Sequence, residues 1–174
     1  MGEIDIFRYP NESDDILDVV FGYLVLAEYK LYEWHINANI KHFVEHLEYK
    51  QTSFFIDDIK YLSSRDDTYI YILKYNDKFC AYIIFKKDGI DKNSIYISQL
   101  YVNIEARMGF AKLLLTKVEE VAEEVKRNKI YLDVAKSNKD AIALYEFADY
   151  IRNPESFNKD DWSYEYRKEL GGNK

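Results

Sequence analysis

The segment between residues 94 and 135 constrains the fold of this chain more than any other part of the sequence. Residues 94–102 alternate in the manner of a strand, and a short turn with a single glycine, Gly109, follows. Apolar residues at three- and four-residue spacing then predict an amphipathic helix to about residue 127, and residues 129–135 read as a second strand. Two strands joined by one helix are expected to pair in parallel, with a right-handed crossover.

The turn at Gly109 also suggests a ligand. A helix that begins directly after a strand presents backbone N–H groups with no partner inside the helix, so its N-terminus is an anion site. Glycine there permits close approach of the backbone, and the pattern therefore favours a phosphate-bearing ligand. For Gly109 taken alone, a plain turn glycine is the favoured interpretation. The second pattern, a helix that follows Asn138 and carries Tyr145 seven residues later, shifts the balance towards a ligand site.

The remaining elements complete one domain, residues 1–174. Alternation predicts a strand at 3–9, a hairpin of 69–75 and 78–86 across Asn76–Asp77, and a last antiparallel strand at 162–170. Helices are expected at 16–35 and around 40–47, with a shorter helical or irregular segment at 52–64. The fold class is α/β (α+β), a mixed and mostly antiparallel sheet with a central parallel strand pair joined by a crossover helix.

Composition narrows the partners. The formal net charge of −7 argues against a sequence-independent nucleic-acid binder and favours a cationic partner. Cys80 is the only cysteine, so no intrachain disulfide forms, and a reducing, cytoplasmic location fits. The N-terminus lacks the pattern of a signal peptide, and the longest apolar run, 19–27, is too short to span a membrane.

Two other kinds of site are weaker interpretations. His42 and His46 are four residues apart on a predicted helix, a spacing that can bind a metal, but a solvent-facing pair is favoured and no metal is expected. A nucleotide-binding redox domain would need a Gly-x-Gly-x-x-Gly after a strand or a Walker-type Gly-Lys-Ser/Thr, and the sequence contains neither.

Residues 68–170 resemble the GNAT superfamily of acyl-CoA-dependent N-acyltransferases. Leu100-Tyr101-Val102 matches the strand end of that family, and Gly109-Phe110-Ala111 matches its Gly-x-Gly/Ala turn. The second signature, Asn-x-x-Ala-x-x-Leu-Tyr-Glu, is present from Asn138 to Glu146. The sequence departs from the family at Ala106, where Gln or Arg is usual, with Arg107 displaced by one, and at Asp149-Tyr150, where Gly-Phe is usual. Residues 10–65 match no named pattern, although the family places substrate-binding helices there.

The resemblance implies acetyl-CoA as co-substrate. It implies that the backbone of the strand at Leu100 and Val102 forms sheet-like hydrogen bonds to the amides of the pantetheine arm of the cofactor. It also implies a hydrogen bond from Asn138 to this pantetheine arm. A helix N-cap is the structural alternative for Asn138, and both roles are compatible. The pyrophosphate is expected on the turn and the first helical residues, with charge from an arginine or a lysine: Arg107, Met108, Gly109, Phe110, Ala111 and Lys112.

Tyr145 is the expected catalytic residue. A phenol beside a departing thiolate can hydrogen-bond to it or protonate it. Because the chain has 17 tyrosines, the position of Tyr145 within the second signature carries this hypothesis, and a core aromatic is the alternative. No general base is identified, since the nearest strand residues, Tyr96, Ser98 and Gln99, include no carboxylate.

The function that follows from the resemblance is transfer of an acetyl group from acetyl-CoA to a primary amine. The acceptor is expected to be a small molecule of the polyamine or aminoglycoside type, or a protein, because the acidic composition favours cations. The resemblance also allows a homodimer. The alternative is a non-catalytic acyl-CoA-binding or interaction domain that keeps the fold.

Overall fold

The computed structural model describes residues 2–9, 61–103, 109–154 and 163–171. The helices predicted at 16–35 and 40–47, the segment 52–60, and the pair His42 and His46 lie outside these residues. None of the helices in the described ranges has the length and hydrophobicity that a membrane span requires. The same ranges hold no group of three or more metal-ligating side chains.

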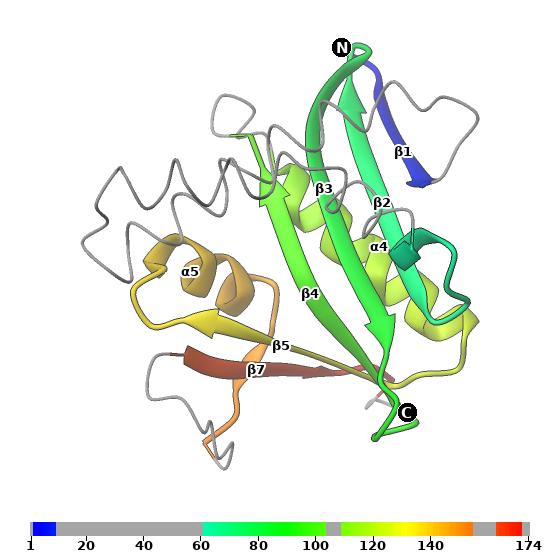
Figure 1. Ribbon diagram of the computed structural model, residues 1–174. Coiled ribbons are helices and arrows are strands. Elements are labelled where there is room, and N and C mark those ends of the chain that lie inside the picture. The colour runs from blue at the N-terminus through cyan, green and yellow to red at the C-terminus, as the bar shows by residue number, and fades with distance from the viewer. Residues whose placement is uncertain (1, 10–60, 104–108, 155–162, 172–174) are drawn as a thin grey trace, which may run out of the picture.

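A seven-stranded mixed sheet forms the body of the molecule, in the order β1-β2-β3-β4-β5-β7-β6 (Figure 1). Only β4 and β5 are parallel, and every other neighbouring pair is antiparallel. The predicted fold class is confirmed. The strands are β1 Ile4–Tyr9, β2 Thr68–Tyr75, β3 Lys78–Lys87, β4 Ser94–Val102, β5 Lys129–Ala135, β6 Ile151–Arg152 and β7 Ser163–Glu169.

The β2–β3 hairpin turns where the sequence predicts it. Asn76 and Asp77 both have positive φ, 49° and 60°. A two-residue hairpin turn of this type needs left-handed backbone at both positions, and Asn and Asp adopt it more readily than other non-glycine residues. The short connection sets the pairing of β2 with β3 next to the turn, and the register shifts between Leu73 and Lys74.

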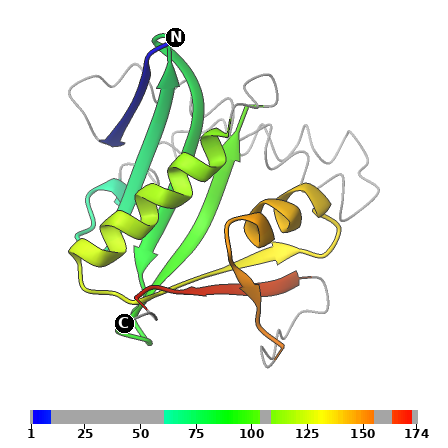
Figure 2. The same ribbon diagram turned by 180° about the vertical axis from the view of Figure 1, so that it is seen from behind.

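Helix α4, Phe110–Glu124, crosses one face of the sheet and joins β4 to β5 (Figure 2). Its buried residues recur every three or four positions, as the sequence predicts, and they enter the main core with Phe85, Ile95 and Leu132. The shorter helix α5, Lys139–Phe147, follows β5. A second cluster of buried side chains lies on the strands β1 to β3, formed by Tyr9, Ile70, Ile72, Tyr82 and Ile84.

Two features of the C-terminal part refine the sequence prediction. The edge strand β6 was not predicted, because two residues are too few to show an alternating pattern. It pairs with β7, so β7 lies inside the sheet between β5 and β6. Outside this part, Cys80 on β3 is 6% exposed and belongs to the main core.

Candidate functional site

The parallel strands β4 and β5 separate along their length. They pair only over Ser94–Ile97 and Lys129–Leu132. Beyond that point, among the described strands, β4 pairs only with β3 and β5 pairs only with β7. Figure 1 shows the two strands spreading apart towards their C-terminal ends. The inner edges therefore offer backbone groups to a ligand in the gap.

A β-bulge marks the point of separation. The register of β3 against β4 shifts between Ile84 and Phe85, which face Gln99 and Ile97, so Ser98 is the extra residue. The Ser98 hydroxyl donates a hydrogen bond to the Ile84 carbonyl at 3.0 Å. A bulge bends its strand and increases the local twist. It is therefore placed to turn β4 away from β5 directly after their paired stretch.

Two of the predicted cofactor-binding residues on β4 direct their backbone N–H groups into the gap. The Asn103 N–H donates to the Cys80 carbonyl on β3 at 2.8 Å. Hydrogen-bonded and non-bonded positions alternate along an antiparallel pair. The N–H groups of Leu100 and Val102 therefore face away from β3, towards the gap that β5 has left. This is the direction that a sheet-like bond to a bound ligand requires.

The N-terminus of α4 has the geometry of an anion site. Gly109 occupies the N-cap position of the helix with φ of 77°. No side chain forms a capping hydrogen bond there, and no acidic residue lies in the first turn. The first intrahelical bond runs from the Leu113 N–H to the Gly109 carbonyl at 3.2 Å. The amides of Phe110, Ala111 and Lys112 consequently have no helical partner. Phe110 anchors this turn because its side chain is buried in the core.

Charge at this helix end comes from one described residue of the predicted set. Lys112 is exposed, and its Nζ lies 5.0 Å from the centre of the Phe147 ring on α5. The other two predicted cofactor residues, Arg107 and Met108, lie outside the described residues.

Asn138 caps α5. Its side-chain oxygen accepts a hydrogen bond from the Ala141 N–H at 3.1 Å. The structural role considered for Asn138 is thus confirmed. Within the described part of the chain the side-chain amide of Asn138 donates to no protein group, so it can still donate to a ligand.

Tyr145 lies on the buried face of α5, 7% exposed. Its ring packs against Tyr150 and Tyr166, with centroids 5.8 Å and 6.5 Å away. The described residues provide no hydrogen-bond partner for its hydroxyl. Burial raises the pKa of Tyr145, and the nearby phenol of Tyr96 raises it further, so Tyr145 keeps its proton at neutral pH. Tyr145 is thus a core aromatic whose protonated hydroxyl has no hydrogen-bond partner in the part of the chain that the structure describes.

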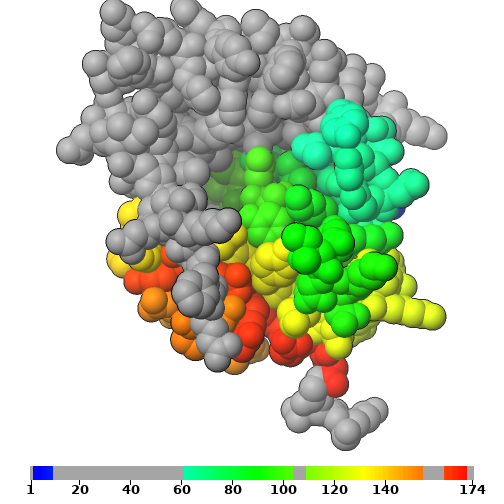
Figure 3. All heavy atoms as spheres, turned by 60° about the horizontal axis from the view of Figure 1, so that its bottom comes forward, coloured from blue at the N-terminus to red at the C-terminus, as the bar shows by residue number. Residues whose placement is uncertain are grey.

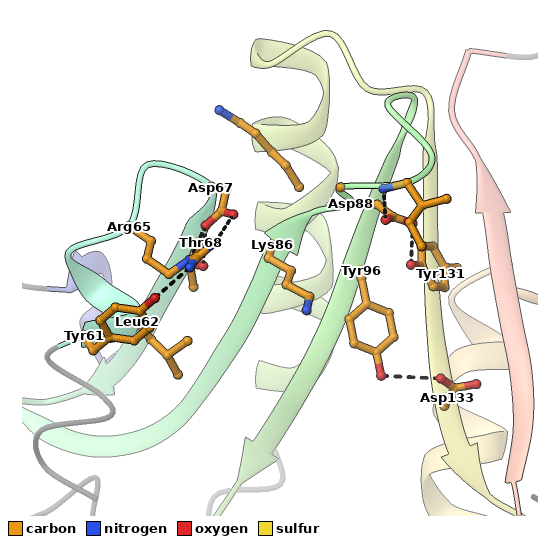
Figure 4. A pocket seen from close by; sticks show the side chains of 13 residues that line it. Tyr61, Leu62, Arg65, Asp67, Thr68, Lys86, Asp88, Tyr96, Tyr131 and Asp133 are labelled. Atoms are coloured by element: carbon orange, nitrogen blue, oxygen red, sulfur yellow. Dashed lines mark hydrogen bonds and ion pairs between the residues drawn. The ribbon is translucent and has the colours of Figure 1, made fainter. Parts of the chain in front are cut away.

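A cleft of about 660 Å³ opens beside the point where β4 and β5 separate. Figure 3 looks towards the end of the sheet at which β4 and β5 begin, where the segment from Tyr61 and the β3–β4 turn both reach the surface. Figure 4 shows the side chains that line it. They come from the segment before β2, from β3 and the turn after it, from β4 and from β5: Tyr61, Leu62, Arg65, Asp67, Thr68, Lys86, Lys87, Asp88, Gly89, Ile90, Tyr96, Tyr131 and Asp133.

Asp133 is the residue of this cleft that sequence reasoning missed. It lies on β5, one position beyond the stretch that pairs with β4. The Tyr96 hydroxyl donates to its carboxylate at 3.4 Å (Figure 4). The side chain of Asp133 is exposed. Partial desolvation by its neighbours and then the negative charge of Glu165 raise the pKa of Asp133, while the hydrogen bond from Tyr96 opposes them. Asp133 and Tyr96 are 37 residues apart, so only the strand register brings them together.

The family model described as Acetyltransferase (GNAT) family matches residues 28–149. Among solved structures, PaiA N-acetyltransferase from Thermoplasma acidophilum, in complex with coenzyme A, is similar at a TM-score of 0.75 and 15% identity, covering 97% of this chain and 99% of that one. An acetyltransferase from Streptococcus agalactiae matches at a TM-score of 0.70 and 16% identity, over 96% and 98%. N-acetyltransferase PseH of Campylobacter jejuni, in complex with acetyl coenzyme A, matches at 0.61 and 17%, over 96% and 99%. No curated protein matches.

Proposed function

Because the chain belongs to the GNAT family of acetyltransferases, we propose that it transfers an acetyl group from acetyl-CoA to a primary amine. The observation that carries this proposal is the gap between β4 and β5, bounded by the free amides of Leu100 and Val102 and by the uncapped N-terminus of α4. These two features suit the two ends of one elongated ligand, an amide-bearing arm and a pyrophosphate.

The residues around the gap fit acetyl-CoA. The pyrophosphate would be held by the amides of Phe110, Ala111 and Lys112, because the positive end of the helix dipole and unpaired N–H groups favour an anion. Gly109 leaves open space, since a Cβ added there would meet no atom of the described residues within 4 Å beyond its chain neighbours. Leu100, Val102 and the amide of Asn138 would hold the pantetheine arm. The ligand supplies an acetyl group activated as a thioester.

Tyr145 is proposed to stabilise the departing thiolate. Its hydroxyl is protonated and has no partner among the described residues, so it can donate a hydrogen bond or a proton. The packing of its ring against Tyr150 and Tyr166 holds that hydroxyl in one place. A fixed donor stabilises developing charge better than a mobile one.

The proposed acceptor is a polyamine or aminoglycoside type of amine, or a protein amine. A formal net charge of −7 supports cationic acceptors through long-range attraction. The cleft beside β4 and β5 is lined by three basic and three acidic side chains, and within it the local support for a cation comes from the carboxylate of Asp133 and the ring of Tyr131. Aromatic faces and carboxylates both attract ammonium groups.

The test combines binding and turnover. Acetyl-CoA binding would be measured by calorimetry, and release of free thiol would be followed over a panel of polyamines, aminoglycosides and lysine-containing peptides. We expect both binding and amine-dependent thiol release. Acetyl-CoA binding without turnover on any amine would favour the alternative, a non-catalytic acyl-CoA-binding domain. Absence of binding would contradict the proposed function itself.

A further inference from the structure

Asp133 occupies the boundary between the β4–β5 gap and the cleft. It is the first residue of β5 beyond the β4 pairing, and its side chain lines the cleft. In Figure 4 the hydroxyl of Tyr96 points at its carboxylate. A group that approaches the gap through the cleft therefore meets Asp133 beside the point where the strands divide.

We propose that the carboxylate of Asp133 is the general base that takes a proton from the acceptor ammonium, with Tyr96 as the residue that positions it. The inference rests on the proposed function, because it assigns a step of the same reaction. In the whole transfer the ammonium nitrogen loses two protons, an amide C–N bond forms and the thioester C–S bond breaks. Asp133 receives the first proton that the ammonium loses and passes it to solvent. The second proton ends on the thiol of CoA.

The surroundings of Asp133 suit this task. Glu165 on β7 is its direct cross-strand neighbour, and two carboxylates opposite each other repel. Partial desolvation and this repulsion together raise the pKa of Asp133, whose side chain is exposed, and so make it a stronger base. The two negative charges also attract a cationic amine. On the other side the ring of Tyr96 on β4 lies beside that of Tyr131, with centroids 5.0 Å apart and the ring planes tilted by 43°. The ammonium group of Lys86 on β3 lies 5.6 Å from the centre of the Tyr96 ring, so this cation also faces the Tyr96 side of the site.

The other carboxylates that line the cleft are held differently. Asp67 forms an ion pair with Arg65 at 2.6 Å, which lowers its pKa to about 2. Burial alone would raise the pKa of Asp88, but hydrogen bonds from the Tyr131 hydroxyl, at 2.5 Å, and from backbone amides lower it. Among the cleft carboxylates of the described residues, Asp133 alone has its basicity increased by its surroundings.

The first experiment needs no turnover. The side-chain carboxyl of Asp133 would be titrated by ¹³C NMR, with Asp133→Asn to assign its signal. We expect a pKa above the ordinary 3.8, a further rise in Tyr96→Phe, which loses the hydrogen bond to the ionised form, and a fall in Glu165→Gln, which loses the like charge. A carboxyl that titrates at or below 3.8 in the parent would overturn the proposal, whatever the activity.

The second experiment uses the pH dependence of kcat/KM for an amine found by the thiol-release panel. The acid limb should follow the titration of Asp133, moving up in Tyr96→Phe and down in Glu165→Gln. Asp133→Asn should lose roughly 10²- to 10⁴-fold in rate together with the acid limb, and should keep its affinity for acetyl-CoA. Asp88→Asn, a carboxylate of the same cleft that is also bonded by a tyrosine, should retain the limb.

Stability separates a base from a structural carboxylate. Because the pKa of Asp133 is raised in the folded state, its ionisation costs stability as pH rises through the folded value. Asp133→Asn should therefore be at least as stable as the parent at pH 7. An Asp133→Asn variant that acetylates the amine at the parental rate, with the parental acid limb, would overturn this inference and leave the acetyltransferase proposal standing. A parent that binds acetyl-CoA but acetylates no amine would instead overturn both.

Discussion

The side chain of Asn138 accepts a hydrogen bond from the backbone N–H of Ala141 at 3.1 Å, and so caps the helix that carries Tyr145. The oxygen of this amide is engaged with the protein, and its nitrogen is available to a ligand. Aspartate in the same place keeps the oxygen and loses the donor. Structural and binding roles of one residue can therefore be separated.

We predict that Asn138→Ala lowers the free energy of unfolding by about 1 kcal/mol, because α5 loses its cap. Asn138→Asp should restore stability, since a carboxylate caps a helix N-terminus well and complements its dipole. Both variants should bind acetyl-CoA more weakly than the parent. Denaturant unfolding measures the change in stability, and calorimetry measures the affinity for acetyl-CoA. If Asn138→Asp binds acetyl-CoA as tightly as the parent, Asn138 does not contact the pantetheine arm.

Gly109 offers a test with an internal control. It has φ of 77°, and Gly171 has φ of 80°. At either position an added Cβ would meet no atom of the described part of the chain within 4 Å, chain neighbours apart. Alanine at each should therefore cost a similar roughly 1–2 kcal/mol of backbone strain. Alanine is preferable to valine, whose β-branch would add strain and obscure the effect on binding.

Only Gly109→Ala should weaken CoA binding, because only that glycine precedes the amides proposed to hold the pyrophosphate. Calorimetric titration with CoA checks this, with unfolding curves to match the stability losses. Equal CoA affinity in Gly109→Ala and Gly171→Ala would place the pyrophosphate elsewhere.

Tyr145→Phe should lower kcat about ten- to a hundredfold with little change in affinity for acetyl-CoA. The hydroxyl interacts best with sulfur once negative charge develops, and one such hydrogen bond is worth roughly 1.5–3 kcal/mol. The ring remains, so stability should barely change. The assay is thiol release under conditions in which chemistry limits the rate.

Tyr150→Phe is the matched control, because Tyr150 contacts Tyr145 and its buried hydroxyl has no hydrogen-bond partner in the described part of the chain. Removing that hydroxyl should leave kcat unchanged and raise stability by about 1 kcal/mol. If Tyr145→Phe turns over at the parental rate, Tyr145 is a core aromatic only.

Local sequence patterns were sufficient to predict most of the strands, the crossover helix and the hairpin turn. The strands at 94–102 and 129–135 were predicted with the boundaries that the structure has, because their alternation is regular and turn residues flank them. The crossover helix followed from its apolar spacing, and its parallel strands from the length of that connection. The left-handed turn at Asn76 and Asp77 is likewise a local property of those two residue types.

Contacts between strands that are far apart in the sequence could not be predicted from the sequence. The bulge at Ser98 depends on how β4 meets β3, and nothing in the residues around Ser98 signals the extra position. Asp133 occupies an ordinary polar position of an alternating strand, and its chemistry comes from Tyr96 and Glu165 on two other strands. The sequence therefore predicted the cofactor side of the candidate site more fully than the acceptor side.

Thermal unfolding with and without acetyl-CoA tests the central claim most directly. At 100 times the dissociation constant, a ligand that binds only the folded state stabilises it by roughly 2.7 kcal/mol, a rise in Tm of roughly 5–10 °C for a chain of this length. We predict this rise with acetyl-CoA and none with NAD. An unchanged Tm at millimolar acetyl-CoA would contradict the assignment of the β4–β5 gap as an acyl-CoA site.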